Sequence, residues 1–169
     1  MKQVRTEKPA VYNSKSTNIN PIDINEEAIL EQAREIIKKR VTRLTTAFSD
    51  PTSVVDYLSI VCSEYESEVF GLLLLDNQYR LIKDEILFKG TVDSCGVYPR
   101  EILKTILLHN AVAVILYHNH PSGETEPSDA DINITKIIKE SVEYINARVL
   151  DHIIVGGTNY HSLAVSGQL

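Results

Sequence analysis

Two histidines separated by one residue, His118 and His120, are the side chains whose type and spacing most clearly favour chemistry. They follow an apolar run at 111–117, which predicts a buried strand. In an extended chain, side chains two residues apart point to the same side, so both imidazoles can face one point. Pro121 and Gly123 then predict a turn that leads into the next helix.

Ser128 and Asp131 lie three residues apart where that helix, expected over 128–145, begins. The spacing puts both side chains on one face of the first turn, and the preceding loop can return Asp131 to the histidines. Two neutral imidazoles and one carboxylate suit Zn²⁺ and leave its fourth position open for water, whose pKa falls to about 7 there. The same Ser-x-x-Asp spacing also forms a helix capping box, which requires no metal.

The other three histidines have ordinary structural interpretations. His109 follows a predicted helix and can cap its C-terminus. His152 lies in the apolar strand expected over 149–155, where it fits a hydrogen-bonded core residue or a supporting partner of a metal ligand. His161 opens the last expected strand beside a turn, so we expect it to be exposed to solvent.

The elements that must position these residues follow from hydrophobic periodicity and turn residues. Asn25 and Asp50 are expected to cap two helices ahead of the sheet, and Pro99 opens a third. The second of these helices carries Cys62 as a small core residue. Helices and strands mix around one sheet, so the predicted class is α/β or α+β. The expected strands are 69–75, 80–88 with a continuation over 91–97, 111–117, 149–155 and 161–165.

The composition of the 169-residue chain limits the class of protein further. A hydrophobic content of 43% supports a sizeable core, and no apolar run reaches the roughly 18 residues of a membrane span. The two cysteines make no disulfide framework, and the polar arm at 1–24 lacks a secretory signal, so we expect a reducing, cytoplasmic setting. A formal net charge of −6 disfavours a broad nucleic-acid surface.

Taken together, His-x-His, seven residues and Ser-x-x-Asp form a pattern that resembles the JAMM (MPN+) metalloprotease family. Around this pattern the chain resembles the bacterial RadC family from about Glu68 to the C-terminus. The resemblance implies a single JAB/MPN domain over 67–169, a mixed sheet flanked by helices. Residues 25–66, which match the family less clearly, are expected from their helical periodicity to form an N-terminal extension. The matching stretches are Phe88-Lys89-Gly90-Thr91, Val97-Tyr98-Pro99-Arg100-Glu101, Asn110-Ala111, His118 to Gly123, Pro127-Ser128 with Asp131, and Leu150-Asp151-His152-Ile153-Ile154-Val155-Gly156.

The resemblance also implies roles for individual residues. His118, His120 and Asp131 would bind one zinc ion, and Ser128 would help to stabilise a tetrahedral oxyanion. Glu68, which opens a segment similar to the family's Glu-x-x-Gly-Leu-Leu, would serve as the general base. The implied activity is zinc-dependent hydrolysis of a peptide or protein substrate by a peptidase or isopeptidase. Further candidates around the ligands are Asn119, Pro121, Gly123 and His152, and Glu64 and Glu66 are alternatives for the base.

Two other functions remain open on the sequence alone. The RadC family was named for DNA repair, which leaves a DNA-repair-associated accessory role, although residues 1–65 lack the glycine-rich signature of a helix-hairpin-helix module. A non-catalytic MPN-type binding module is the second, and loss of a ligand would mark it. Cys95 is expected to be an inert thiol, and an exposed edge strand would allow a homodimer.

Overall fold

A computed structural model of the chain describes residues 28–37, 51–90 and 97–169. The chain divides into two compact units, residues 1–33 and 34–169. Residues 28–37 are helical, within the segment expected to form a helical extension. Several predicted features lie outside the described residues: the caps Asn25 and Asp50, the polar arm, Cys95 and the expected strand continuation at 91–96.

The sheet and the candidate site belong to the second unit, and its elements agree in kind and order with those predicted. Proline occupies the first position of two helices, α2 and α3, as their sequences indicate. Among the described residues, none of the helices is long and apolar enough to cross a membrane. In chain order the elements are α2 (Pro51–Cys62), β1 (Val69–Leu75), β2 (Leu81–Lys89), α3 (Pro99–Leu108), β3 (Ala113–Asn119), α4 (Asp129–Glu143), β4 (Arg148–Gly156) and β5 (Asn159–Ser162).

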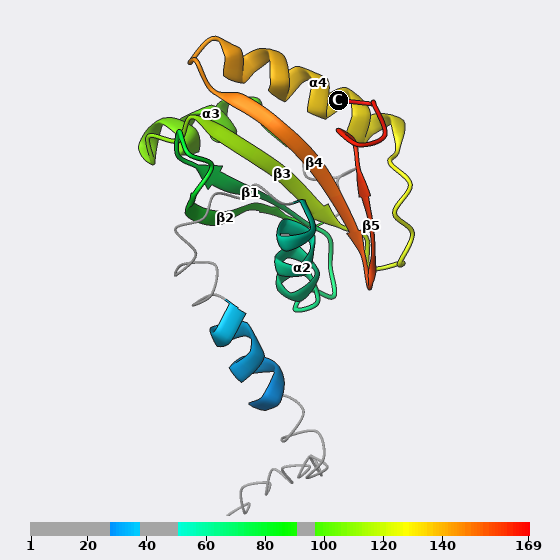
Figure 1. Ribbon diagram of the computed structural model, residues 1–169. Coiled ribbons are helices and arrows are strands. Elements are labelled where there is room, and N and C mark those ends of the chain that lie inside the picture. Colours follow the sequence, from blue (N-terminus) through cyan, green and yellow to red (C-terminus); the bar gives the residue numbers. More distant parts are fainter. Residues whose placement is uncertain (1–27, 38–50, 91–96) are drawn as a thin grey trace, which may run out of the picture. The chain divides into compact units, whose positions relative to one another are not determined.

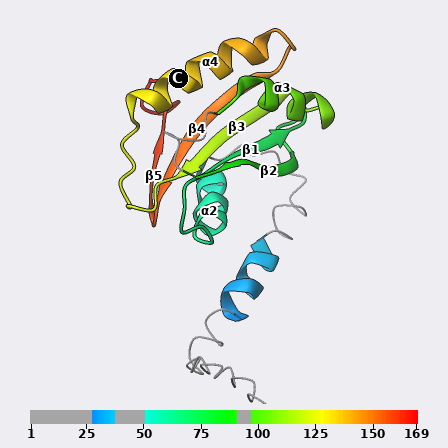
Figure 2. The ribbon, with the colours of Figure 1, turned by 180° about the vertical axis from the view of Figure 1, so that it is seen from behind.

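The five strands form one mixed sheet in the order β2-β1-β3-β4-β5. Strand β1 runs antiparallel to β2 and β3, β3 and β4 are parallel and joined through α4, and β5 returns antiparallel to β4. Helices α3 and α4 lie on one face of the sheet and α2 lies on the other (Figures 1 and 2). This confirms the predicted α/β class, with a single domain in which helices flank a mixed sheet.

The two central strands, β1 and β3, are buried along their whole length, as their continuous apolar sequences predict. Alternate residues serve different cores, because successive side chains point to opposite faces of a sheet. Leu72 and Leu116 pack with residues of α3 and α4, whereas Leu73 and Ile115 pack with residues of α2. The alternation therefore assigns His118, two residues beyond Leu116, to the face that α4 covers.

A tyrosine network on the α2 side of the sheet links strand β3 to helix α2 and, across β1, to strand β2. Tyr57 of α2 and Tyr117 of β3 each donate a hydrogen bond of 2.6 Å to the carboxylate of Asp84 on β2. Gly71 leaves the space for this arrangement, since a Cβ there would lie 2.3 Å from Cζ of Tyr117. The network holds the strand end that carries His118.

Strand β5 differs from the predicted strand at 161–165, because it begins at Asn159 and ends at Ser162. The carboxylate of Asp151 on β4 draws the chain out of the sheet there. It accepts hydrogen bonds from the Ser162 hydroxyl at 2.5 Å and from the backbone nitrogen of Ala164 at 3.0 Å. Val165, expected in the strand, is consequently exposed.

Candidate metal centre

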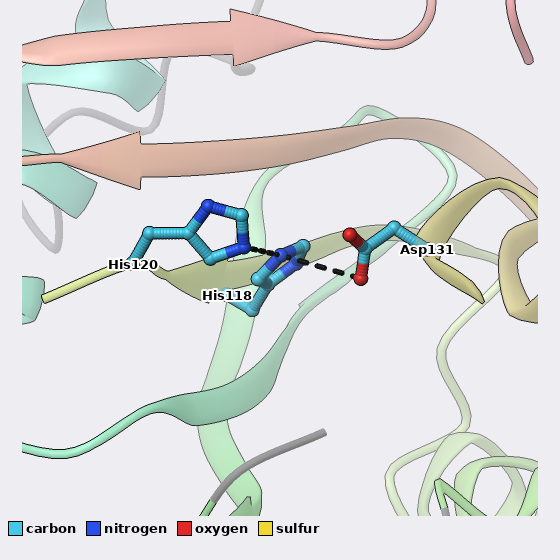
Figure 3. A group of neighbouring side chains, drawn as sticks. All are labelled: His118, His120 and Asp131. Carbon is cyan, nitrogen blue, oxygen red and sulfur yellow. Dashed lines mark hydrogen bonds and ion pairs between the residues drawn. The ribbon is translucent and has the colours of Figure 1, made fainter. Parts of the chain in front are cut away.

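His118, His120 and Asp131 converge at one end of the sheet (Figure 3). Nε2 of His118 lies 2.9 Å from Nε2 of His120 and 3.5 Å from Oδ1 of Asp131. The ligand atoms that the three residues offer all lie within 4.8 Å of one another. His118 and Asp131 are buried and His120 is half-buried, so the group could hold a metal ion largely shielded from solvent.

The backbone at the end of β3 explains why both histidines face the same point. His118 is the penultimate residue of β3, and His120 continues the ladder because its backbone nitrogen donates to the carbonyl of Val155 at 2.8 Å. The chain then turns at Gly123, which has φ +84°, a conformation that favours glycine. The nitrogen of Gly123 donates to the carbonyl of His120 at 3.0 Å and closes this turn.

The capping box predicted at the start of α4 is present, and it leaves one carboxylate oxygen of Asp131 for other use. Oδ2 of Asp131 accepts hydrogen bonds from the backbone nitrogen of Ser128 at 2.8 Å and from its hydroxyl at 2.5 Å. The nitrogen of Asp131 donates in return to Oγ of Ser128 at 3.2 Å. Because Oδ1 faces His118, the capping and ligand interpretations of this motif are compatible.

The surroundings of His118 and His120 favour neutral rings, the form in which an imidazole binds a metal ion. Nδ1 of His120 lies 2.8 Å from the carbonyl oxygen of Glu124, which only accepts, so Nδ1 carries the hydrogen and Nε2 keeps its lone pair. Burial, together with the proximity of His120, lowers the pKa of His118 to about 4 against the opposing effect of Asp131. At neutral pH, protons therefore compete weakly for His118.

His152 contacts the group directly, as the sequence allowed. Its Nε2 lies 2.8 Å from Nδ1 of His118, and burial holds its pKa well below the ordinary range. Thr135, which the sequence reasoning missed, lies 2.5 Å from Nδ1 of His152. Thr135 lies four residues after Asp131 and therefore on the same helix face, and this spacing could have indicated it from the sequence.

The remaining histidines lie apart from the group. His109 is the C-cap residue of α3, as predicted, and its Nδ1 lies 3.0 Å from the carbonyl of Thr105. His161 was expected to be exposed but is half-buried, because the C-terminal turn brings Oε1 of Gln168 to within 2.9 Å of its Nε2.

Asn119, between the two histidines, points to the segment that precedes β1. Its Oδ1 accepts a hydrogen bond of 2.7 Å from the nitrogen of Val69, and its Nδ2 donates to the carbonyl of Ser67 at 3.2 Å. The side chain therefore ties the strand that carries the histidines to the residues on both sides of Glu68.

Glu68 lies immediately before β1, at the same end of the sheet as the histidines. The antiparallel register pairs Phe70 with His118, so the chain at Glu68 approaches the level of His120. Its side chain is half-buried, whereas Glu64 and Glu66 are exposed on the connection after α2. Among these glutamates, Glu68 is the one that the strand register brings closest to the level of the histidine pair.

A pocket of about 320 Å³ adjoins His120 on the α2 side of the sheet end. Cys62 contributes to its wall, and burial raises the pKa of this thiol to about 12, which agrees with an inert core residue. The lining residues are Cys62, Ser63, Tyr65, Glu66, Asn119, His120, Pro121, Val155 and Gly157.

Comparison with known proteins places this geometry in a family. The family model described as "RadC-like JAB domain" matches residues 48–168, so the chain belongs to the RadC-like JAB domain family, as the motifs predicted. A UPF0758 protein of Vibrio cholerae serotype O1 is 50% identical over 133 residues, which cover 79% of this chain and 84% of that protein. A UPF0758 protein of Pseudoalteromonas translucida is 48% identical over 141 residues, 83% of this chain and 62% of that relative.

Proposed function

We propose that this chain is a zinc-dependent hydrolase that cleaves an amide bond, peptide or isopeptide, in a peptide or protein substrate. The observation that carries the proposal is the convergence of two imidazole nitrogens and one carboxylate oxygen within 4.8 Å. Imidazoles favour zinc over the hard cations Mg²⁺ and Ca²⁺, and three protein ligands are typical of a catalytic rather than a structural zinc site. When bound, zinc lowers the pKa of coordinated water and polarises a carbonyl group.

The proposed roles of Glu68 and Ser128 are supported by their positions. Glu68, at the level of His120 and half-buried, would accept the proton of the attacking water and pass it to the leaving amine. Ser128 is the N-cap of α4 and lies beside the ligand Asp131. The hydroxyl, which donates to Oδ2 of Asp131 in the structure, would turn to the oxyanion that develops on the substrate carbonyl. The positive end of the helix dipole would stabilise the same oxyanion.

The pocket beside His120 offers room for a substrate side chain next to the reacting bond. Glu66 is the acidic residue among those that line it, and none of the lining residues is lysine or arginine. All three residues of the proposed ligand set are present and close together, which favours catalysis over a module that only binds. The net charge of −6 disfavours direct binding of nucleic acid.

The experiment that tests the proposal compares metal-free and zinc-loaded protein on a library of linear and isopeptide-linked peptides. We expect cleavage in the zinc-loaded sample, its loss after chelation, and its return when zinc is restored, because the chemistry depends on the metal. Mass spectrometry of the products identifies the bond that is cleaved. Equal cleavage by metal-free protein, or none by zinc-loaded protein across the library, would contradict the proposal.

A further inference from the structure

We propose that the Thr135 hydroxyl sets how tightly the site holds zinc, by fixing which ring nitrogens of His152 and His118 carry hydrogen. The inference rests on the proposed zinc site and assigns a positioning role to a residue outside the ligand set. It follows from a chain of hydrogen bonds that begins at the backbone carbonyl of Asp131 and ends at Nδ1 of His118, on the side of the ring away from the ligand atom Nε2.

The chain consists of three short contacts between buried groups. Oγ1 of Thr135 lies 2.6 Å from the carbonyl oxygen of Asp131 and 2.5 Å from Nδ1 of His152. Nε2 of His152 then lies 2.8 Å from Nδ1 of His118. Thr135 is 1% exposed and both histidines are 0% exposed, so water cannot replace any of these partners.

The direction of the chain follows from its first acceptor. A carbonyl oxygen cannot donate, so at 2.6 Å the single hydroxyl hydrogen of Thr135 must point to the Asp131 carbonyl. The same Oγ1 can then only accept from His152, whose hydrogen must be on Nδ1. A neutral imidazole with hydrogen on Nδ1 accepts at Nε2, so Nδ1 of His118 donates to it.

This direction leaves the lone pair of His118 on Nε2, the atom that faces the candidate site. His120 also presents Nε2 as a lone pair, because its Nδ1 donates to the Glu124 carbonyl. The two nitrogens are 2.9 Å apart, with the Asp131 carboxylate 3.5 Å from His118. Acceptors that face one another without a hydrogen between them repel, and a bound cation removes that repulsion.

Without the Thr135 hydroxyl, the direction would no longer be fixed. His118 could then place its hydrogen on Nε2 and donate it to Nε2 of His120 at 2.9 Å. That arrangement would satisfy the metal-free pair and would have to be undone before zinc could bind. The Thr135 hydroxyl therefore disfavours the form of His118 that carries hydrogen on Nε2. It also links the helix that carries Asp131 to the strands that carry the histidines.

Zinc affinity of the full chain, measured by competition with a chromophoric chelator, tests this role. Thr135→Val, which keeps the shape and removes the hydroxyl, should weaken zinc binding by roughly 10- to 100-fold, the usual effect of losing an outer partner of a ligand. Thr135→Ser should restore affinity close to wild type. Ser141→Ala is the matched control, because Ser141 on the same helix makes the same bond to the carbonyl four residues earlier but is only half-buried and its hydroxyl bond is exposed.

A merely structural role would give a different pattern. Thr135→Val would then lower the melting temperature while the folded protein kept wild-type zinc affinity, and that result would overturn the inference. If the wild type binds zinc and Thr135→Val binds it with the same affinity, only this inference is rejected. If the wild type does not bind zinc, the proposed function is rejected as well.

Nitrogen-15 NMR of the metal-free protein provides a second readout, and its measurement on the wild type needs no variant to fold. We expect His118 and His152 both to carry hydrogen on Nδ1, and His118 to shift toward the Nε2–H form in Thr135→Val. A wild-type His118 with its hydrogen on Nε2 would overturn the inference.

Discussion

Replacing His118 by alanine is expected to abolish zinc binding, with a loss of affinity well beyond the roughly 10- to 100-fold caused by removing an outer partner. The reason is that His118 is the central member of the group, in contact with both His120 and Asp131. Isothermal titration of metal-free protein with zinc measures the effect. The same variant should lose zinc-dependent hydrolysis.

Loss of structure must be separated from loss of the ligand, because His118→Ala also leaves Nε2 of buried His152 without its partner. An unsatisfied buried acceptor costs about 1–3 kcal/mol of stability, so the free energy of unfolding should be measured alongside. His109→Ala is the matched control, a histidine that caps α3 away from the site. Zinc affinity of folded His118→Ala within about tenfold of wild type, an energy difference of about 1.4 kcal/mol, would refute the assignment.

Asp131→Asn separates the two roles of that residue. An amide oxygen can still accept the capping hydrogen bonds that Oδ2 receives from Ser128, so the start of α4 should be retained. The negative charge that Oδ1 directs at His118 is lost. We therefore expect weaker zinc binding with a smaller change in stability than a capping substitution such as Ser128→Ala causes.

Glu68→Gln is expected to retain zinc and to lose turnover by about 10²- to 10⁴-fold, the usual contribution of a general base. The amide keeps the shape of the half-buried side chain but cannot accept a proton from water. Single-turnover rates at saturating zinc measure the chemical step, and zinc titration of the same sample measures metal affinity.

Glu66→Gln is the matched control for this prediction. It makes the same change two residues earlier, at an exposed position that lines the pocket beside His120. The control should keep its rate on uncharged substrates. If Glu68→Gln retained full activity while Glu66→Gln lost it, the base would have to be reassigned to Glu66.

Much of the sheet and half of the site could be predicted from local patterns. Apolar runs defined β1 and β3, and the two-residue period of a strand placed His118 and His120 on one side. The Ser-x-x-Asp spacing predicted the capping box of α4. These features depend on residues close together in the sequence, which is why they can be predicted without a structure.

Contacts between residues that are far apart in the sequence could not be predicted. Asn119 bonds the nitrogen of Val69, fifty residues away, and Thr135 reaches His152 on the next parallel strand. Both depend on strand order and register, which no short motif encodes. The end of β5 was predicted wrongly for the same reason, since the carboxylate of Asp151 on another strand sets it.

The most direct test of the zinc assignment is the X-ray absorption spectrum of the full chain loaded with one equivalent of zinc. We expect tightly bound zinc with nitrogen and oxygen neighbours only, at about 2.0–2.1 Å, and the scattering pattern of two imidazoles. A sulfur neighbour at about 2.3 Å, a single imidazole, or zinc that is lost on gel filtration would contradict it.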